Sequence, residues 1–394
     1  MSRARHLQPL PVPPGAGALD VLPALQRALD GDGPARIPVR GDDGAEARRL
    51  AAALAGPLTP AEDAAEDPTA LVIATSGSTG TPKGVLLSAS ALRASAGATH
   101  RRLGGPGHWL LAMPAHHIAG IQVLVRALLA GTRPDAVDTT EGFRPDRFAT
   151  AARRVLAADG PHYTALVPTQ LSRLVSAGGD GLAALREFDA VLLGGAATPP
   201  ALLDRARAEG VRVTTTYGMS ETSGGCVYDG VPLDTAEVRV EGETGPVLLS
   251  GPMLARGYRH QPEAAAFTGG WFRTGDLGRW RDGRLEVLGR ADDMIITGGV
   301  NVAPLAVERV LTAQPGVREA CVLGVPDPEW GQAVVAAVVP DDTAAPPAEP
   351  DLRAAVRAEL NPAAAPKRVT FLPELPLRGP GKPDRRALAA LFQG

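Results

Sequence analysis

A short run of hydroxyl and glycine residues that ends in a lysine is the segment of this sequence best suited to chemistry. It extends from Thr75 to Gly84 and reads TSGSTGTPKG. Glycines let the backbone approach a polyphosphate and aim N–H groups at it, while hydroxyls donate further hydrogen bonds and Lys83 adds a mobile charge. It is not the Walker pattern, because Pro82 and Gly84 flank the lysine. We interpret the segment as a phosphate-binding loop; the alternative is an ordinary surface loop.

Lysine is rare in this chain, which gives each lysine more weight. Of the 40 lysine and arginine residues only three are lysines, at positions 83, 367 and 382. Lysine is a compact, flexible point charge that can reach a phosphate oxygen, whereas arginine is a planar fork. We therefore expect a lysine-specific role for Lys83 and Lys382. For Lys367, in a Pro-Lys-Arg context, chance retention is the better explanation.

Further polar residues follow apolar runs, and each has an ordinary explanation when taken alone. His116 and His117 would be core or surface imidazoles, or a weak metal pair. Glu221 suits Mg²⁺, which takes few protein carboxylates and several phosphate oxygens, but it equally suits a helix N-terminus. Asp276 could accept hydrogen bonds from two ribose hydroxyls, or belong to a common Thr-Gly-Asp turn.

The elements that must position these residues alternate between strands and helices from Ala70 onward. Short apolar runs, typical of buried strands, are separated by segments of helical spacing. This rhythm indicates an α/β fold with a parallel sheet and helices on its faces. The expected strands are 70–75, 163–167, 190–193 and 211–215, and the expected helices are 118–128, 170–175 and 200–208.

The two ends of the chain have different textures. Residues 1–69 are rich in Ala, Pro, Gly and Asp and predict one amphipathic helix, at 22–29. From about residue 235 alternation predicts antiparallel β-structure. We expect a large N-terminal domain over 1–290, its β-rich part at 233–290, and a small mobile α+β C-terminal domain over 291–394. The latter should contain helices at 305–311 and 352–360, strands at 320–325 and 334–339, and a loop at 341–350.

The composition excludes several classes of function. The 394 residues carry a formal net charge of −3, which gives no electrostatic footprint for a nucleic acid or an anionic membrane. The longest apolar run, Ala333–Val339, is far shorter than the ~20 residues of a membrane span. The first residues do not resemble a signal peptide, and Cys226 and Cys321 offer no disulfide framework. We expect a cytoplasmic protein.

Taken together and in order, these segments resemble the signatures of the adenylate-forming enzymes, which include acyl-CoA ligases, peptide-synthetase adenylation domains and luciferases. The loop ending in Pro-Lys-Gly is among the most specific of these signatures, and the resemblance covers residues 70–388. It implies a small carboxylic acid, ATP and CoA as substrates, with Mg²⁺ bound. The acid would attack the α-phosphorus to give acyl-AMP and pyrophosphate, and a thiol would then accept the acyl group.

The resemblance also implies roles for single residues. Glu221 would bind Mg²⁺, His117 would lie beside the acyl pocket and thiol tunnel, Asp292 would be the hinge, and Lys382 would be the catalytic lysine. Pro383 departs from the family, which usually has another apolar residue there. The expected ATP contacts are Thr75, Ser76, Gly77, Ser78, Thr79, Gly80 and Lys83 at the phosphates, Gly195, Ala196, Tyr217 and Gly218 at the adenine, Ser220 at the α-phosphate, and Asp276 and Arg290 at the ribose. Gly298 and Gly299 would line the pantetheine path.

Residues 217–233 and 103–107, and the short segment before the phosphate-binding loop, look like one branch, the 2-succinylbenzoate CoA ligases of menaquinone biosynthesis. In that reading Gly224 leaves room for an aromatic ring and Ser223 donates a hydrogen bond. Arg126 and His116 are candidates for the second carboxylate, but a solvated helix charge and an edge imidazole explain them as well.

Other functions stay open at this point. Another acyl-CoA ligase, or a stand-alone acyl-AMP synthetase for an aromatic or small acid, is the enzymatic alternative. A catalytically silent nucleotide-binding module would have no need of Glu221, Asp276, Arg290 and Lys382 together. The sequence leaves the oligomeric state open, a homodimer included.

Overall fold

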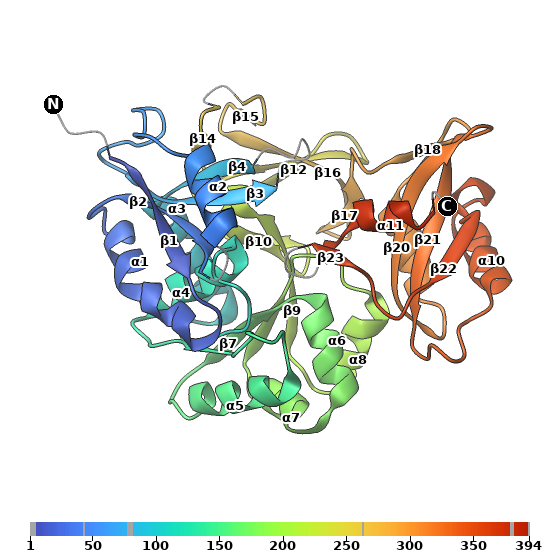
Figure 1. The fold of residues 1–394 in the computed structure, drawn as a ribbon, viewed down its shortest axis with the longest axis horizontal. Coiled ribbons are helices and arrows are strands. Elements are labelled where there is room, and N and C mark those ends of the chain that lie inside the picture. The colour runs from blue at the N-terminus through green and yellow to red at the C-terminus, as the bar shows by residue number, and fades with distance from the viewer. Residues whose placement is uncertain (1–4, 42–43, 77–81, 262–263, 379–381, 393–394) are drawn as a thin grey trace. The chain divides into compact units, whose positions relative to one another are not determined.

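The computed structural model describes residues 5–41, 44–76, 82–261, 264–378 and 382–392 (Figure 1). The chain divides into two compact units. The first contains the residues up to Gly195 together with Ala206–Arg239 and Leu248–Arg273, and the second contains Ala196–Arg205, Val240–Val247 and the residues from Thr274 onward. The domain boundary expected at residue 290 stays a prediction.

One sheet of the first unit is mostly parallel, as the alternating pattern predicted. Its order is β11-β10-β9-β8-β7-β5-β6, in which β6, β5, β7, β8 and β9 pair in parallel and β10 and β11 continue the sheet antiparallel. The strands are β5 (His108–Leu111), β6 (Asp135–Ala136), β7 (His162–Leu166), β8 (Ala190–Leu193), β9 (Val213–Met219), β10 (Gly224–Tyr228) and β11 (Val231–Pro232). The connecting helices are α4 (Ile118–Ala130), α5 (Pro145–Leu156), α6 (Pro168–Ala177), α7 (Gly179–Glu187) and α8 (Pro200–Ala208).

A second sheet of this unit was not predicted. Its order is β1-β2-β3-β4-β14, formed by β1 (Leu7–Val12), β2 (Ala35–Arg40), β3 (Thr69–Ser76), β4 (Pro82–Ser88) and β14 (Gly257–Tyr258). The strand expected at 70–75 is therefore present as β3, but it lies here, parallel to β2 and antiparallel to β4, and not in the parallel sheet. Strand β1 was not predicted because it contains Pro9 and Pro11, which are unusual in strands. The prolines are tolerated because β1 is an edge strand, where a missing N–H removes no ladder hydrogen bond.

Helices lie between these two sheets. The helices of the N-terminal region are α1 (Leu22–Leu29), where the sequence predicted it, α2 (Gly44–Ala53), α3 (Ala89–Leu103) and a 3-10 segment at Gly15–Val21. Of these, α2 is not in the layer between the sheets, because it packs on β1 and β2 in the separate core that includes Val72 and Leu86. Helix α3 contacts β3 and β4 of one sheet and β10 of the other, and it packs on α1 and α4. The side chains of Leu25, Leu92 and Ile121 are fully buried in this layer. The burial of each of these side chains contributes about 1.5–3 kcal/mol to folding. The packing of this helical layer therefore holds the two sheets together.

The strands after residue 235 include antiparallel pairs, as predicted. They are β12 (Glu237–Val240), β13 (Gly245–Ser250), β15 (Phe267–Thr268), β16 (Trp271–Arg281) and β17 (Arg284–Arg290). Strand β16 pairs antiparallel with β15 and with β17. Residues of both units occur in β12, β13 and β16.

The second unit contains the predicted α+β segment. Its sheet has the order β19-β18-β21-β20, with β22 parallel to β21. The elements are β18 (Ile295–Thr297), β19 (Val300–Val302), α9 (Pro304–Thr312), β20 (Val317–Asp327), β21 (Gly331–Pro340), α10 (Glu349–Glu359), a 3-10 turn at Pro362–Ala364, β22 (Arg368–Phe371), β23 (Leu377–Arg378), β24 (Lys382–Pro383) and α11 (Arg385–Ala390).

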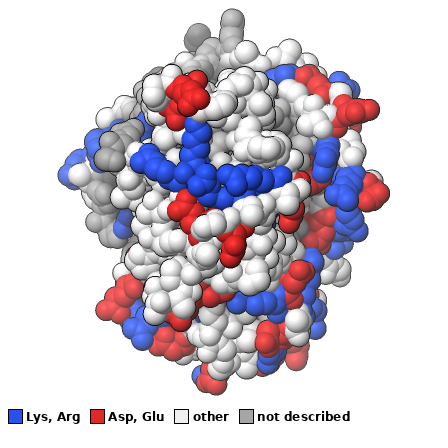
Figure 2. All heavy atoms as spheres, turned by 90° about the vertical axis from the view of Figure 1, so that its right-hand side faces the viewer, with Lys and Arg blue, Asp and Glu red and all other residues white. Residues whose placement is uncertain are grey.

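Strand β21 is buried on both faces, which explains the longest apolar run of the sequence. Val334, Ala336 and Val338 belong to the core that includes α9 and α10, whereas Val335 and Ala337 belong to the core that includes α11. Successive residues of a strand point to opposite faces, so one strand serves two cores. In the described part of the chain no helix is long and apolar enough to cross a membrane. On the face drawn in Figure 2 basic side chains form a continuous band across the upper half, and basic and acidic side chains are mixed over the rest.

Candidate functional site

An antiparallel ladder flanks the predicted phosphate-binding loop. Strands β3 and β4 pair Thr75 with Lys83 and Ser76 with Pro82, and the Thr75 hydroxyl donates to the carbonyl of Lys83 over 3.4 Å. Lys83 therefore belongs to β4, which the sequence analysis did not foresee. The predicted phosphate contacts Gly77, Ser78, Thr79 and Gly80 lie outside the described residues.

One tyrosine connects Lys83 with Glu221. The ammonium nitrogen of Lys83 lies 5.1 Å from the ring centroid of Tyr258, and the Tyr258 hydroxyl donates to Oε1 of Glu221 over 2.9 Å. Tyr258 lies on β14, which pairs with β4 opposite Val85. The first unit thus brings together the predicted phosphate-binding lysine and the predicted magnesium ligand. Sequence reasoning missed Tyr258, since nothing near it in the chain forms a motif.

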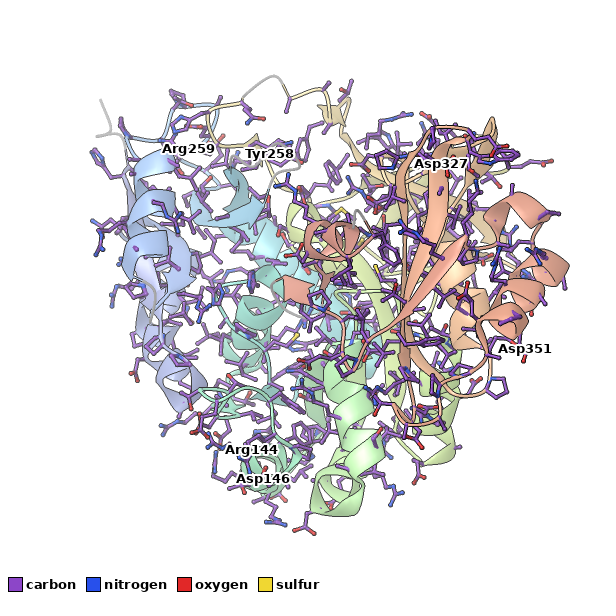
Figure 3. All side chains as sticks on the ribbon, turned by 45° about the vertical axis from the view of Figure 1, so that its right-hand side comes forward. Arg144, Asp146, Tyr258, Arg259, Asp327 and Asp351 are labelled. Atoms are coloured by element: carbon purple, nitrogen blue, oxygen red, sulfur yellow. The ribbon has the colours of Figure 1, made fainter. Side chains whose placement is uncertain are left out.

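A buried ion pair fastens β14 in place. Arg259, next to Tyr258 in Figure 3, pairs with Glu62, and both side chains are almost fully buried. The backbone N–H of Arg259 donates to the carbonyl of Gly84 over 2.7 Å. Burial alone would raise the pKa of Glu62, but hydrogen bonds from the Thr59 and His260 N–H groups and the Arg259 charge lower it below its ordinary value.

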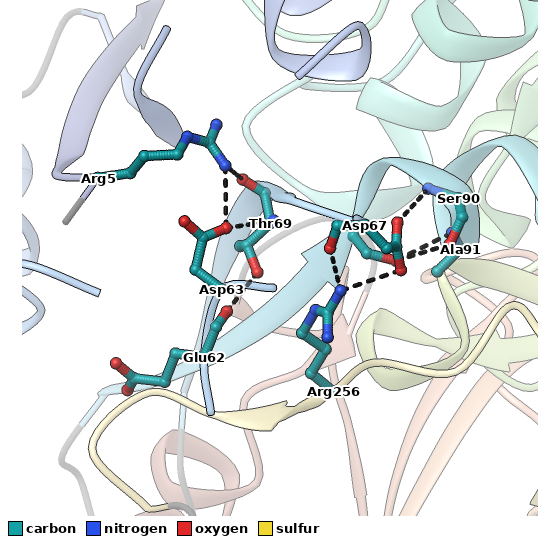
Figure 4. A network of polar contacts seen from close by, with 9 residues as sticks. Arg5, Glu62, Asp63, Asp67, Thr69, Ser90, Ala91 and Arg256 are labelled. Atoms are coloured by element: carbon teal, nitrogen blue, oxygen red, sulfur yellow. Dashed lines mark hydrogen bonds and ion pairs between the residues drawn. The ribbon is translucent and has the colours of Figure 1, made fainter. Parts of the chain in front are cut away.

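Further polar contacts tie the segment before β3 to its surroundings (Figure 4). Oδ1 of Asp63 accepts from Arg5 over 2.9 Å and from the Thr69 N–H over 2.8 Å. Arg256, two residues before Tyr258, pairs with Oδ2 of Asp67 over 3.0 Å. The side chain of Tyr258 is consequently held on an element with several independent anchors.

Glu221 lies in a 3-10 turn (Ser220–Thr222) between β9 and β10. Its backbone carbonyl accepts from the Ala255 N–H over 2.8 Å, and the Thr222 hydroxyl donates to the carbonyl of Gly224 over 2.7 Å. At Gly218 a Cβ atom would come within 2.2 Å of the Gly224 carbonyl oxygen, so only glycine allows the two strands to approach. Ser220, the predicted α-phosphate contact, is buried in the same turn.

The predicted adenine contacts follow neighbouring parallel strands. Gly195 and Ala196 come after β8, and Tyr217 is near the end of β9. Thr216, just before it, donates its hydroxyl hydrogen to the Leu193 carbonyl over 3.3 Å. Carboxyl ends of adjacent parallel strands are where open α/β sheets bind ligands. This topology agrees with the predicted adenine site, whose contacts stay predictions.

The Ser223 hydroxyl has a partner within the protein, and its predicted contact with the substrate stays a prediction. Ser223 is fully buried, and its hydroxyl donates to the carbonyl of Met253 over 2.9 Å. Its own carbonyl accepts from Ser95 over 2.9 Å and from Gln122 over 2.7 Å. Sequence alone could not reveal these partners, because they are remote along the chain.

The two predicted histidines precede helix α4. Their ring centroids are 4.2 Å apart, and both side chains are partly buried. His117 is the residue immediately before α4, and its carbonyl accepts from the Ile121 N–H over 3.0 Å. Its predicted place beside the acyl pocket stays a prediction.

In the second unit, the predicted ribose contacts and the predicted hinge lie together. Asp276 on β16 pairs with Arg290 on β17, with 3.8 Å between Oδ1 and Nε. Arg290 donates two hydrogen bonds to Asp292, at 3.0 and 3.1 Å. The pKa of Asp292 is lowered, first by these hydrogen bonds and further by the charge of Arg290. Arg290 therefore couples the two carboxylates.

The predicted pantetheine residues form the tight turn between β18 and β19. Gly298 and Gly299 both have positive φ, of 55° and 79°. A Cβ atom on Gly298 would lie 2.5 Å from the ring of Trp330, so glycine is required there.

Lys382 lies in β24, opposite Arg378 in β23, and its side chain is exposed. Two features anchor the residues that follow it. Asp384 caps α11 by accepting from the N–H groups of Arg386 and Ala387, each over 3.1 Å. Arg385 pairs with Glu308 over 3.2 Å. Lys382 belongs to the second unit and Lys83 to the first, so their convergence on one nucleotide stays a prediction.

The described residues contain no group of three or more His, Cys, Asp or Glu side chains that could hold a metal ion. Glu221 with its Tyr258 partner is a single carboxylate. This suits Mg²⁺ bound together with phosphate oxygens, because Mg²⁺ is commonly held by one or two carboxylates plus substrate phosphates.

Comparison with known proteins decides the family. The model of the AMP-binding enzyme family matches residues 18–259, and the model of the AMP-binding enzyme C-terminal domain matches residues 306–382. This chain belongs to the AMP-binding enzyme family. Its fold is accordingly the α/β fold of adenylate-forming enzymes, with an AMP-binding N-terminal part and a small C-terminal domain.

Several relatives are similar over most of the chain. A probable 2-succinylbenzoate–CoA ligase from Mycobacterium tuberculosis is 46% identical over 392 residues, covering 98% of this chain and 99% of the relative. The amide bond synthetase McbA from Marinactinospora thermotolerans is 28% identical with a TM-score of 0.83, covering 100% and 90%. The o-succinylbenzoate CoA synthetase MenE from Bacillus subtilis, solved with its acyl-adenylate intermediate, is 25% identical with a TM-score of 0.75, covering 98% and 88%. The same synthetase, solved with ATP and a magnesium ion, is 29% identical with a TM-score of 0.67, covering 79% and 67%.

Proposed function

We propose that this chain activates 2-succinylbenzoate with ATP and transfers the acyl group to CoA, a step of menaquinone biosynthesis. The observation that carries the proposal is the contact of Lys83 and Glu221 with the same tyrosine, beside the phosphate-binding loop. The substrate is supported by the 46% identity to the mycobacterial relative and by the similarity to the synthetase solved with its acyl-adenylate.

Two anions must be held together for this reaction. A carboxylate is repelled by the triphosphate, so both need to be aligned and their charge neutralised. Lys83 would hold phosphate oxygens, and Tyr258 would orient the Glu221 carboxylate toward the magnesium site. The bound ion supplies further charge neutralisation at the phosphates. Lys382 would approach the α-phosphate and the substrate carboxylate.

The reaction would proceed in two steps. A carboxylate oxygen forms a bond to the α-phosphorus while the bond to the β-phosphate oxygen breaks, releasing pyrophosphate. The CoA thiol then gives its proton to solvent and its sulfur forms a bond to the acyl carbon, while the bond between that carbon and the phosphate oxygen breaks and AMP leaves. The C-terminal domain would rotate between these steps. During that rotation Arg290 would change its ion pairing with Asp276 and Asp292.

A specific alternative to the second step is amide formation, because the amide bond synthetase is similar over the whole chain. In that case an amine would capture the acyl-adenylate. The test is to supply ATP, Mg²⁺ and 2-succinylbenzoate, first with CoA and then with simple amines, and to score AMP, thioester and amide. We expect AMP and thioester with CoA. Thioester absent but amide formed would favour this alternative, and ADP would contradict both.

The cellular setting follows from the same proposal. Cys226 and Cys321 are free and buried, and burial raises the pKa of each thiol to about 12. Such thiols are compatible with a reducing cytoplasm, where ATP and CoA are available.

A further inference from the structure

Arg385 connects the segment that carries Lys382 with three other parts of the second unit. It is the first residue of α11, three positions after Lys382, and its side chain is partly buried. Its guanidinium donates to the carbonyl of Val322 on β20, lies 3.2 Å from a carboxylate oxygen of Glu308 on α9, and has its Nε 3.7 Å from Oδ2 of Asp293. The residue therefore joins α11 to β20, to α9 and to the residue that follows the predicted hinge.

Glu308 is the carboxylate at the centre of this arrangement. Its side chain is only 14% exposed, and its Oε1 accepts from Arg385 and also from the N–H of Val322, the latter over 2.8 Å. Burial raises the pKa of Glu308, whereas the charge of Arg385 and the hydrogen bond from Val322 act in the opposite direction. The neighbouring thiol of Cys321, whose pKa burial raises to about 12, brings no charge at neutral pH. Arg385 is thus the cation that compensates Glu308.

A largely buried carboxylate carries a cost, so the pair of Arg385 and Glu308 needs a reason. Charged side chains are almost never buried unless they are paired, and even a paired charge is often no more stabilising than apolar residues of similar volume. What such a pair provides is direction, because a planar guanidinium held at several oxygens takes up one orientation. The contacts of Arg385 therefore fix where α11 begins, at the end of that helix which lies next to Lys382 (Figure 1).

The two residues between Lys382 and Arg385 pass this fixed position on to the lysine. Pro383 has a restricted φ, and the N–H of Asp384 donates to the carbonyl of Pro376 over 2.7 Å. The side chain of Asp384 caps α11. Because the side chain of Lys382 is exposed, the place that its ammonium group can reach depends on where the backbone holds its Cα.

We propose that Arg385 is a positioning residue for the adenylation step. Anchored on Glu308 and on the carbonyl of Val322, it fixes the backbone from which Lys382 reaches the reacting groups. This inference rests on the proposed function, because Arg385 acts through the lysine that is assigned to adenylation. Its loss leaves Lys382 in the chain but moves the ammonium group away from the position in which its charge stabilises the reaction.

The first test compares Arg385→Met with Arg386→Met, which changes the next residue of α11, an exposed arginine. Arg385→Met should lower single-turnover formation of acyl-AMP by roughly 10- to 100-fold, because a small misplacement of a reacting group is enough for such a loss. Transfer from synthetic 2-succinylbenzoyl-AMP to CoA should change little. Arg386→Met should match wild type in both steps, and Arg385→Lys, which keeps the charge, should recover part of the adenylation rate.

A double-mutant cycle with Lys382→Ala separates positioning from stability. If Arg385 acts through Lys382, Arg385→Met should slow adenylation by less than about 2-fold in a chain that already carries Lys382→Ala. Two residues that act independently would instead have effects that multiply. Multiplying effects, or equal losses in the adenylation and thioester steps, would mean that Arg385 only supports the fold and would overturn the inference.

A second variant keeps the test valid if Arg385→Met by itself is unstable. That substitution leaves the carboxylate of Glu308 without its cation, which is strongly destabilising in a poorly exposed site. Arg385→Met combined with Glu308→Gln removes this uncompensated charge. The melting temperature should then return toward the wild-type value while adenylation stays slow. Recovery of the adenylation rate together with the melting temperature would contradict a positioning role, because stability alone would explain the loss.

Failure of the proposed function would look different. If wild type forms no acyl-AMP from 2-succinylbenzoate, the assigned substrate is wrong, and the same cycle is run with an acid that the protein does activate. If wild type forms acyl-AMP and Lys382→Ala does so at the same rate, the assigned substrate stands. The positioning role then falls, because Arg385 has no lysine to act through.

Discussion

The Tyr258 hydroxyl donates to Oε1 of Glu221 over 2.9 Å while the ring of the same residue lies against the ammonium group of Lys83. Tyr258→Phe keeps the ring and removes only the hydrogen bond that orients the carboxylate. A hydrogen bond to a charged group contributes about 1.5–3 kcal/mol, so we expect adenylation to slow by roughly 10- to 100-fold. The concentration of Mg²⁺ needed for half-maximal rate should rise, as measured by pyrophosphate exchange over a magnesium series.

The control for Tyr258→Phe is Tyr163→Phe. The Tyr163 hydroxyl donates to the carbonyls of Leu103 and Gly105, at 3.2 and 3.1 Å, on the other sheet. This variant should lower stability without changing the magnesium requirement. If Tyr258→Phe matched wild type across the series, Glu221 would not depend on Tyr258 for its orientation.

Lys382→Ala tests the assigned catalytic lysine. Losing a preorganised charge partner should lower single-turnover formation of acyl-AMP by ~10²-fold or more. Lys367→Ala removes the other lysine of the second unit, which pairs with Asp327 at 3.4 Å, and should leave adenylation unchanged. Unchanged acyl-AMP formation in Lys382→Ala would refute the role given to that lysine.

Asp292 combines a backbone position with a charge, and two substitutions separate them. Asp292→Pro restricts the backbone at the predicted hinge, so thioester formation should suffer more than adenylation. Asp292→Asn keeps the backbone free and removes the charge that Arg290 binds, so the two half-reactions should change by similar factors. Rapid-quench measurement of each half-reaction gives the comparison, and equal effects in the proline variant would contradict a hinge.

The buried pair of Arg259 and Glu62 should govern acid stability of the first unit. Removing one partner of such a pair costs about 3–5 kcal/mol, so Glu62→Gln should lower the free energy of unfolding by roughly 3 kcal/mol at pH 7. Because the pKa of Glu62 is lowered on folding, its contribution is present above about 4.5, the ordinary value, and is lost as pH falls through the lower folded value. The difference between wild type and variant in denaturant titrations should therefore shrink at acid pH; a constant difference would argue against this linkage.

Local patterns were enough to predict much of the parallel sheet and its helices. The ranges of β8, α8 and α1 agree with those expected from hydrophobic spacing, because each element buries one clear apolar run or stripe. The missed strands have different causes. Prolines interrupt β1, and β4 carries only three consecutive apolar residues behind a glycine-rich loop.

In the candidate site, too, residues within a motif could be predicted, whereas residues that act through contacts distant in the sequence could not. Glu221 and Lys83 could be named from their own motifs. Tyr258 could not, since its importance depends on β14 pairing with β4, more than 150 residues earlier in the chain. The hydrogen bond from the Ser223 hydroxyl to the Met253 carbonyl could not be predicted either, because Met253 lies in another distant segment. Side-chain partners of this kind become visible only when the strands are assembled.

Because β21 is buried on both faces, removal of the segment that follows Lys382 should affect the stability of the second unit. Leu388 and Phe392 of the terminal segment cover one face of the sheet, while α9 and α10 cover the opposite face. Proteolysis just after Lys382 would expose the valine and alanine side chains on one face of β21 to water. We therefore expect it to unfold the whole unit and to promote aggregation. The predicted catalytic lysine would thereby depend, for a folded domain around it, on the dozen residues that follow it.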